Sequence, residues 1–185
     1  KLNKGVEHLL KNAGARLVAG WATFKDAKHC TVETKDGPVN IEAENVILAT
    51  GSTPIELPFM KFDEEYICSS TGALDLDALP EKVAVIGVGY IGLELGIALR
   101  RLGSEVTVVE GLDKVLAIFD DELRRPLTTW LRKNGVTTHV NCLAQGAEVK
   151  GGKVELTWKN AEGEMESETF DKVLVTVGRR PNTRG

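Results

Sequence analysis

The sequence predicts an α/β fold, on three observations from its second half. Residues 83–86 are an apolar run that leads through a glycine-rich turn into a helical pattern ending at Gly103, and residues 105–110 then read as a second strand. A further helical pattern around residues 123–131 ends at Gly135. A hairpin pattern, "KVELTWKNAEGEMESETF", leads into an apolar strand at residues 173–177. Strands that alternate with helices are typical of a parallel sheet covered by helices.

The first half of the chain repeats part of this pattern. A helical pattern over residues 6–13 stops at Gly14, and "ARLVAG" at residues 15–20 reads as a strand. A hairpin around Asp36-Gly37 continues into an apolar strand at residues 46–49, and the irregular residues 52–80 read as a connection between domains. The sequences "ENVILATGS" and "DKVLVTVGR" end the two halves in the same way, but only the second has a glycine turn upstream. We therefore expect one complete dinucleotide-binding domain preceded by the tail of another, the alternative being a chance similarity of two strands.

Two helices carry more specific expectations. The helix after the glycine turn places apolar residues on one expected buried face, namely Ile91, Leu95, Ala98, Leu99 and Leu102. Pro126 interrupts the later helix, because proline lacks the backbone N–H and clashes with the preceding turn. Either that helix begins near Pro126 or it is kinked there, and the sequence leaves both alternatives open.

Composition and charge argue against several classes of protein. The 23 basic and 27 acidic residues are mixed along the chain, so neither nucleic acid nor an anionic membrane is expected as a partner. No stretch approaches the roughly 20 apolar residues of a membrane span. Cys30, Cys68 and Cys142 have no C-x-x-C or metal-ligand spacing, which favours unreactive thiols in a reducing, cytoplasmic compartment and no metal site. The chain begins at Lys1 without a signal-peptide pattern, so we expect a piece from the interior of a longer protein.

The turn Gly87-Val88-Gly89-Tyr90-Ile91-Gly92 lies between a buried strand and an amphipathic helix, the context of a Rossmann-like dinucleotide-binding fold. Gly87 permits the tight turn, Gly89 leaves the backbone open to a pyrophosphate, and Gly92 lets helix and strand pack closely. The diphosphate would lie on free N–H groups at the helix N-terminus, where the helix dipole favours negative charge. The alternative is a glycine turn that serves only close packing.

Two acids near this turn are candidate site residues. Glu110 ends the next strand, 23 positions after Gly87, where a carboxylate can accept hydrogen bonds from the adenosine ribose. A 2′-phosphate would meet like charge there, so the sequence predicts NAD rather than NADP; the alternative is a solvated acid at a strand end. Glu94 lies beside apolar helix residues, and it either faces solvent or pairs with a cation from outside this chain.

The chain resembles the flavin disulfide reductases, and within them most closely the lipoamide branch. The motifs that carry the resemblance are Ala-Thr-Gly-Ser at 49–52, "LPEKVAVIGVGYIGLELG" at 79–96, "LGSEVTVVE" at 102–110, and "VGRRPN" at 177–182. The resemblance implies an FAD domain interrupted by an inserted NAD domain with a hairpin or meander insertion. Residues 1–75 would then be the later part of the FAD domain and its connection, residues 76–178 the NAD domain, and residues 179–185 the return to the FAD domain.

The resemblance also implies roles for single residues. Gly87 to Gly92 would hold the NAD pyrophosphate, with Glu110 on the ribose, Ala144 near the adenine and Gly178 beside the nicotinamide half. Ile91 would lie near the flavin, and Glu94 would pair with a lysine outside this chain. The residues implied to approach FAD are Ala22, Thr50, Gly51 and Ser52.

The function implied by the resemblance belongs to a longer, homodimeric flavoprotein. Such a protein oxidises dihydrolipoyl groups on the lipoyl domains of a 2-oxo acid dehydrogenase complex through a redox disulfide, FAD and NAD. The two cysteines four residues apart that form this disulfide are absent from the sequence, so no catalytic residue is expected in this chain and the segment alone is expected to be inactive. The alternatives are another flavin-dependent disulfide reductase or transhydrogenase, and a non-catalytic NAD-binding module.

Overall fold

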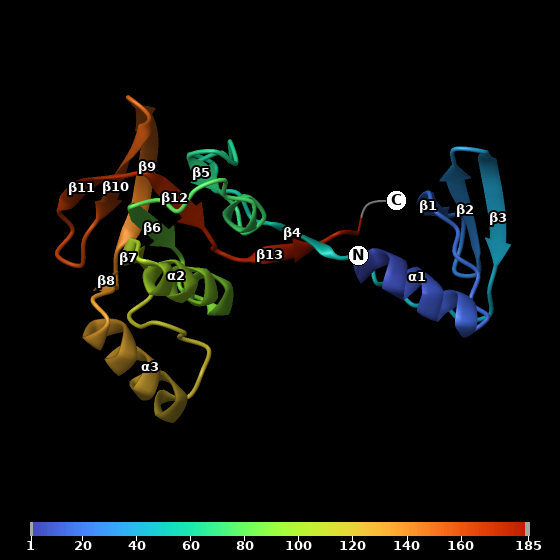
Figure 1. Cartoon of the computed structure of the whole chain (residues 1–185), viewed down its shortest axis with the longest axis horizontal. Coiled ribbons are helices and arrows are strands. Elements are labelled where there is room, and N and C mark those ends of the chain that lie inside the picture. Colours follow the sequence, from blue (N-terminus) through green and yellow to red (C-terminus); the bar gives the residue numbers. More distant parts are fainter. Residues whose placement is uncertain (1, 184–185) are drawn as a thin grey trace. The chain divides into compact units, whose positions relative to one another are not determined.

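The computed structural model describes residues 2–183 and divides into two compact units (Figure 1). The terminal unit contains residues up to Gly51 together with those from Pro181 onward, and the central unit is Ser52–Arg180. The predicted domain segments 1–75, 76–178 and 179–185 stay predictions, and residues 1 and 184–185 of these segments lie outside the described residues.

The terminal unit consists of one helix and a small antiparallel sheet. Helix α1 is Leu2–Asn12, and the sheet has the order β1-β2-β3 with β1 at Trp21–Phe24, β2 at His29–Thr34 and β3 at Gly37–Glu42. Strands β2 and β3 pair from His29↔Glu42 to Thr34↔Gly37. The predicted helix and hairpin are therefore confirmed.

Two strands predicted in the terminal unit are absent from the described structure. The prediction of a strand at residues 15–20 is wrong, because β1 pairs with β2 only from Trp21↔Glu33 onward and β2 ends one residue later at Thr34. The prediction at residues 46–49 is also wrong: no strand of residues 2–183 pairs with this segment. Its side chains are accordingly exposed, 92% for Ile47 and 72% for Leu48. An apolar strand needs neighbours that satisfy its backbone groups and cover its side chains.

The central unit is built on a five-stranded parallel sheet with the order β5-β12-β6-β7-β8. Its strands are β5 (Ile67–Cys68), β6 (Lys82–Ile86), β7 (Glu105–Val109), β8 (Thr137–His139) and β12 (Lys172–Val175). Helix α2 (Tyr90–Leu102) connects β6 to β7, and helix α3 (Asp121–Lys133) connects β7 to β8. The predicted α/β class with a Rossmann-like parallel sheet is confirmed.

A second sheet, antiparallel and with the order β11-β10-β9, covers one face of the parallel sheet, while α2 and α3 lie on the other (Figure 1). Its strands are β9 (Leu143–Lys150), β10 (Lys153–Lys159) and β11 (Met165–Phe170). Successive side chains of a strand point to opposite faces, so β6 contributes Ala84 and Ile86 to the core under β10 and Val83 and Val85 to the core under the helices.

The segment from residue 52 to 80 is part of the central unit despite its irregular sequence. It contains β4 (Ser52–Pro54), β5 and the 3₁₀ turn η1 (Gly72–Leu74), and it adds the buried side chains of Met60 and Ile67 to the core. Strand β4 forms a two-stranded sheet with β13 (Arg179–Pro181).

None of the described helices has both the length and the apolar character that a membrane crossing requires.

The buried face of α2 differs from the predicted one. The residues of α2 that are buried are Gly92, Leu93, Gly96 and Leu99, whereas Leu102 is 69% exposed. Two of these four buried residues are glycines, which have no apolar side chain for hydrophobic periodicity to detect. Two glycines on one side of a helix nevertheless let its backbone approach a sheet closely.

Helix α3 begins five residues before Pro126, at Asp121. The alternative of a helix that starts near Pro126 is therefore wrong, and the proline lies in the second turn. Acidic residues Asp121 and Glu122 in the first turn and basic residues Arg132 and Lys133 in the last both complement the helix dipole, which favours this placement of the ends.

Candidate dinucleotide site

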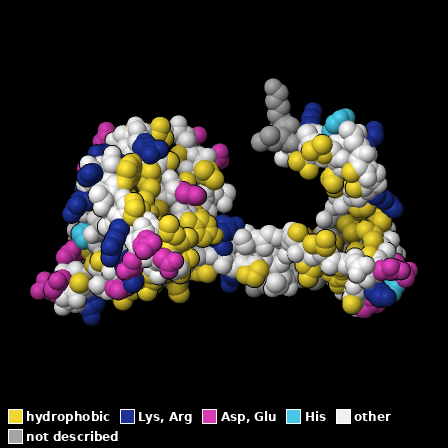
Figure 2. Space-filling model, turned by 90° about the horizontal axis from the view of Figure 1, so that it is seen from below, with side chains coloured by type: hydrophobic (Ala, Val, Ile, Leu, Met, Phe, Trp, Pro, Cys, Tyr) yellow, Lys and Arg dark blue, Asp and Glu magenta, His cyan; other side chains and the backbone are white. Residues whose placement is uncertain are grey.

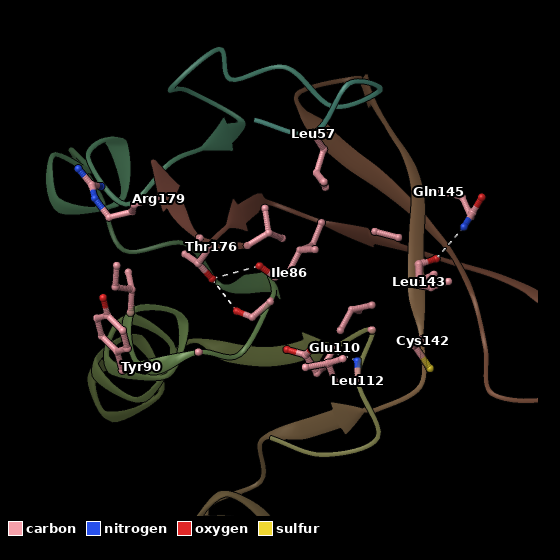
Figure 3. Close-up of a pocket in the computed structure, with 18 of the residues that line it drawn as sticks. Leu57, Ile86, Tyr90, Glu110, Leu112, Cys142, Leu143, Gln145, Thr176 and Arg179 are labelled. Atoms are coloured by element: carbon pink, nitrogen blue, oxygen red, sulfur yellow. Dashed lines mark hydrogen bonds between the residues drawn. The ribbon is translucent and has the colours of Figure 1, made fainter. Parts of the chain in front are cut away.

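The central unit contains a pocket of about 820 Å³ at the carboxyl ends of β6, β7 and β12 (Figure 3). Its volume lies in the range of about 300–1,000 Å³ that is common for small-molecule and cofactor sites. The pocket is lined by Leu57, Phe59, Ile86, Gly87, Gly89, Tyr90, Ile91, Val109, Glu110, Gly111, Leu112, Ile118, Cys142, Leu143, Ala144, Gln145, Thr176, Val177, Gly178 and Arg179.

Sheet topology explains why the pocket lies there. From β6 the chain proceeds through β7 to β8 on one side of the sheet, while β12 lies on the other side of β6. The order of the strands therefore reverses beside β6, and crevices at such reversals are where open α/β sheets bind ligands.

Gly87 opens the turn after β6 with a positive φ of +82°, a conformation that L side chains rarely adopt. Its N–H donates to the Val109 carbonyl on β7 at 2.9 Å. Its carbonyl accepts a hydrogen bond from the Thr176 hydroxyl at 2.6 Å, and Figure 3 shows the Thr176 side chain between this carbonyl and that of Ile86. The first residue of the turn is thus held from both neighbouring strands.

Both backbone polar groups of Val88 are also hydrogen-bonded to groups outside the turn. Its N–H donates to Oε2 of Glu110 at 2.8 Å, and its carbonyl accepts from the N–H of Leu116 at 3.2 Å. The Val88 side chain is 1% exposed and belongs to the core beneath the helices. Val88 therefore supports the pocket floor from below and does not line it.

The next three N–H groups, of Gly89, Tyr90 and Ile91, donate to no group of residues 2–183. They precede the first helical hydrogen bond, from Leu93 to Gly89, as expected for a helix N-terminus. A Cβ built on Gly89 would meet nothing within 4 Å, so it would project into open space. Three free donors at the positive end of a helix, beside a glycine without a side chain, fit an anionic diphosphate.

Gly92 serves packing. A Cβ at this position would clash with the Gly87 carbonyl oxygen and with Oγ1 of Thr176, so only glycine allows α2 to lie this close to the turn. The pocket lies on the other side of the turn, and Gly92 does not line it.

Glu110 is half-buried at the pocket wall, and two backbone amides orient its carboxylate. Oε2 accepts from Val88, and Oε1 accepts from the N–H of Leu112 at 2.9 Å (Figure 3). An ionised carboxylate has about four lone-pair sites, so about two stay available to a ligand. A fixed acceptor of this kind suits a pair of hydroxyl groups.

Part of the pocket wall is apolar. Leu57, Val109, Leu143 and Ala144 line it beside Cys142, whose thiol donates to the Val140 carbonyl at 3.2 Å. Burial raises the pKa of the Cys142 thiol, which keeps it protonated and unreactive at neutral pH. Such a wall suits a flat aromatic base.

The other two cysteines follow the sequence-based expectation of free thiols. Cys30, Cys68 and Cys142 are all free, and Cys68 and Cys142 are buried. Burial raises the pKa of the Cys68 thiol to about 11, so it too is protonated at neutral pH.

The structure brings together most of the residues predicted for NAD: Gly87, Gly89, Tyr90, Ile91, Glu110, Ala144 and Gly178 all line the pocket. Val88 and Gly92 lie beneath its floor. Glu94 is exposed on α2, and no Lys, Arg or His of the described residues lies within ion-pair distance of its carboxylate. Its role stays a prediction.

The residues predicted for FAD lie outside this pocket. In the terminal unit, the hydroxyl of Thr50 donates to the Asn182 carbonyl, and the Asn182 N–H donates to the Gly51 carbonyl at 3.0 Å, while Ala22 is exposed on β1. In the central unit, Ser52 is held by Arg179, whose Nε donates to the serine hydroxyl at 2.8 Å. Their roles also stay predictions.

Sequence reasoning missed Thr176, Leu57 and Arg179 as lining residues. Arg179 stands in the Gly-Arg-Arg-Pro-Asn motif, which could have marked it as a candidate. Leu57 lies in the irregular segment, where no sequence signal exists. Thr176 makes its side-chain hydrogen bonds with Ile86 and Gly87, about 90 positions earlier in the chain, so no local pattern could reveal it.

The parallel sheet, the glycine turn with its free amides and the oriented acid together define a protein with a Rossmann-like dinucleotide-binding fold. The chain belongs to the pyridine nucleotide-disulphide oxidoreductase family, whose sequence model matches residues 1–185. The predicted similarity to the lipoamide branch is confirmed by relatives at 41–45% identity.

Two relatives show this similarity, and one solved structure matches the fold of the chain. The chain is 45% identical over 183 residues to dihydrolipoyl dehydrogenase of Geobacillus stearothermophilus and 41% identical over 186 residues to that of Pseudomonas aeruginosa, covering 99% and 100% of this chain but only 38% and 39% of theirs. The crystal structure of LpdA from Mycobacterium tuberculosis matches with a TM-score of 0.87 at 30% identity, over 98% of this chain and 40% of that one. This chain thus spans about two fifths of the length of these relatives.

A flavoprotein of another description has a similar structure. The HOCl-induced flavoprotein disulfide reductase RclA from Escherichia coli, described as a Cu(II) complex, matches with a TM-score of 0.81 at 26% identity. It covers 98% of this chain, which spans 40% of the RclA chain.

Proposed function

We propose that the central unit binds NAD in this pocket, as the NAD-binding portion of a dihydrolipoyl dehydrogenase. The observation that carries the proposal is the row of three unpartnered N–H groups at Gly89, Tyr90 and Ile91 beside the oriented carboxylate of Glu110, among the residues that the structure describes. Together they offer donors to a diphosphate and an acceptor to a sugar, which are the two polar features of an adenosine diphosphate half.

Each region of the pocket takes a part of this ligand in the proposal. The diphosphate lies on the free amides, the ribose hydroxyls donate to Glu110, and the adenine packs near Ala144 and Leu143. Gly178 and Ile91 line the remaining part of the pocket, where the nicotinamide half would lie. When bound, NAD⁺ supplies the hydride acceptor. The residues of this chain bind and orient it, and the apolar lining of the pocket keeps water away from it.

For the whole protein we infer the reaction of its dihydrolipoyl dehydrogenase relatives, with FAD as the second cofactor. The dithiol of a dihydrolipoyl group would be oxidised to a disulfide with loss of two electrons and two protons, and FAD and NAD⁺ would supply the electron acceptors. None of the residues in the proposed site acts as a nucleophile or an acid–base group, so the 185-residue chain alone is expected to show no lipoamide-dependent turnover. A homodimer that serves the lipoyl domains of a 2-oxo acid dehydrogenase complex is part of the same proposal.

Glu110 makes the site selective for NAD over NADP in this proposal. Replacing the ribose 2′-hydroxyl by a phosphate removes a donor to the carboxylate and places a second negative charge beside it. Among the described residues, the basic side chain that lines the pocket is that of Arg179. Its guanidinium group donates hydrogen bonds to Ser52 and Ser70. It is therefore not free to neutralise an additional phosphate.

Calorimetric titration of the 185-residue chain with NAD⁺ and NADP⁺ tests the proposal. We expect saturable NAD⁺ binding and at least tenfold weaker NADP⁺ binding. The Gly89→Ala variant is expected to lose most NAD⁺ affinity, because its methyl group would enter open space in the pocket. Gly5→Ala is the matched control, since a Cβ at Gly5 also meets nothing within 4 Å but lies in α1.

A Glu110→Gln variant tests the selectivity separately. We expect weaker NAD⁺ binding and a smaller preference over NADP⁺, because the amide removes the charge and retains only one oxygen for the two backbone donors. Glu162→Gln, an equal change of charge in an exposed turn, is the control. NADP⁺ binding as tight as NAD⁺ binding in the unmodified chain would contradict the assignment of Glu110.

A further inference from the structure

One peptide group in the glycine turn is held at both ends by side chains from different strand ends. The carbonyl of Gly87 accepts from the hydroxyl of Thr176, which follows β12, at 2.6 Å. The N–H of Val88, at the other end of the same peptide group, donates to the carboxylate of Glu110, which follows β7, at 2.8 Å. Strands β12 and β7 flank β6 on its two sides, so the peptide is held from both.

The orientation of this peptide matters because it immediately precedes the three free amides. Gly87 has no Cβ and already lies at a positive φ, so steric barriers to a rotation of the Gly87–Val88 peptide are low. Rotation by half a turn would direct the Gly87 carbonyl at the carboxylate of Glu110, acceptor against acceptor. It would also remove the Val88 N–H from its only partner among the described residues, although a buried amide requires one.

The hydrogen bond from the Thr176 hydroxyl to the Gly87 carbonyl opposes this rotation directly. Thr176 is fixed by its own N–H, which donates to the Ile86 carbonyl at 2.8 Å, and its Oγ1 also lies 3.1 Å from that carbonyl oxygen. A Cβ on Gly92 would clash with Oγ1, which shows how closely the hydroxyl fits between the turn and α2. The position of the hydroxyl is therefore determined by β6, by the glycine turn and by α2.

We propose that Thr176 is a positioning residue of the dinucleotide site: together with Glu110 it fixes the Gly87–Val88 peptide, and through it the direction in which the N–H groups of Gly89, Tyr90 and Ile91 point at a diphosphate. The inference rests on the proposed function, which it deepens by adding a residue that does not touch the diphosphate. It gives Glu110 a second task besides the recognition of the ribose.

Three variants of the 185-residue chain separate this role from a general contribution to stability. Thr176→Val removes the hydroxyl and keeps the shape, while Thr176→Ser restores the hydroxyl. Thr157→Val is the matched control, because Thr157 also donates its hydroxyl to a glycine carbonyl, that of Gly146 at 3.2 Å, but in the antiparallel sheet outside the pocket. The measurements are the Kd values for NAD⁺ and for adenosine, which lacks the diphosphate, and the amide exchange rate of Val88.

We expect Thr176→Val to bind NAD⁺ about three- to tenfold more weakly, the loss that corresponds to one hydrogen bond, with adenosine affinity unchanged. Its Val88 amide is expected to exchange faster than in the unmodified chain, whereas Thr176→Ser and Thr157→Val retain normal values in all three measurements. Equal effects of Thr176→Val and Thr157→Val, or equal losses for NAD⁺ and adenosine, would overturn the inference. Failure of the unmodified chain to bind NAD⁺ would instead contradict the proposed function, and Val88 exchange would still decide whether Thr176 fixes the peptide.

Discussion

Gly92 and Gly96 lie one turn apart on the buried face of α2, but their surroundings differ. A Cβ on Gly92 would clash with the Gly87 carbonyl oxygen and with the Thr176 hydroxyl. A Cβ on Gly96 would lie 3.5 Å from Val85 and 3.6 Å from Val106, which is ordinary van der Waals contact. Close helix-to-turn packing is therefore needed at the first position and not at the second.

This difference predicts opposite effects for the same substitution in one helix. Gly92→Ala is expected to lower the free energy of unfolding by about 1–3 kcal/mol, because backbone atoms of the turn must move. Gly96→Ala is expected to be neutral or to raise it by up to about 1 kcal/mol, because alanine favours the helix. Urea denaturation of both variants checks the prediction, and equal changes in the two would contradict it.

Single residues of the site were predictable to the extent that their function depends on local sequence. The glycine fingerprint and the acid at the end of the next strand follow a fixed spacing, so Gly87, Gly89 and Glu110 could be found without a structure. Thr176 could not, because its partners come from a strand that is remote in sequence and adjacent only in the sheet. The second bond of Glu110, to Val88, likewise became visible only in three dimensions.

At the scale of secondary structure, periodicity identified the elements better than their buried faces. Strands β6, β7, β10, β11 and β12 and all three described α-helices agree with sequence expectations, because each has a glycine stop or an apolar pattern of its own. The face of α2 was misassigned because glycines form the contact. Residues 46–49 have the composition of a buried strand, but composition does not supply the neighbouring strand that such an element needs.

Helix α3 carries a destabilising residue in its second turn. Pro126 cannot donate a hydrogen bond to the carbonyl of Glu122, one turn earlier, and its ring crowds that turn. Pro126→Ala is therefore expected to raise the free energy of unfolding by about 1–3 kcal/mol, because proline disfavours a helix interior by about 3 kcal/mol relative to alanine. Urea denaturation measures the effect, with Ala98→Pro in α2 as the reverse change; a less stable Pro126→Ala chain would refute the prediction.

At the scale of the whole molecule, the fold class followed from the order of strands and helices, but the extent of the compact units did not. Residues 52–75 belong to the central unit, where Met60 and Ile67 complete its core, although their sequence reads as a connection. Apolar side chains also gather on the surface of both units in Figure 2. Among the exposed apolar residues of the terminal unit, Val46, Ile47 and Leu48 are consecutive, and they pair with no strand of residues 2–183.

This consecutive apolar segment predicts self-association of the chain. Extended backbone with free N–H and C=O groups and exposed apolar side chains can pair with a second molecule. Replacing Ile47 and Leu48 by Glu is expected to lower the average molar mass seen by light scattering. Replacing Leu74 and Leu123, which are exposed but far apart in sequence, by Glu is the control and is expected to leave the mass unchanged. A strictly monomeric unmodified chain would rule out this association.

The position of β12 between β5 and β6 has a consequence for how the protein emerges from the ribosome. Strand β6 leaves the exit tunnel about 90 residues ahead of this neighbour, with one edge bare until residues 172–175 follow. The pocket at the carboxyl ends of the strands is then completed by the last strand of the parallel sheet to be translated. A nascent chain halted before that strand would leave both β5 and one edge of β6 without a neighbouring strand, and unpaired edges of this kind can associate with other chains.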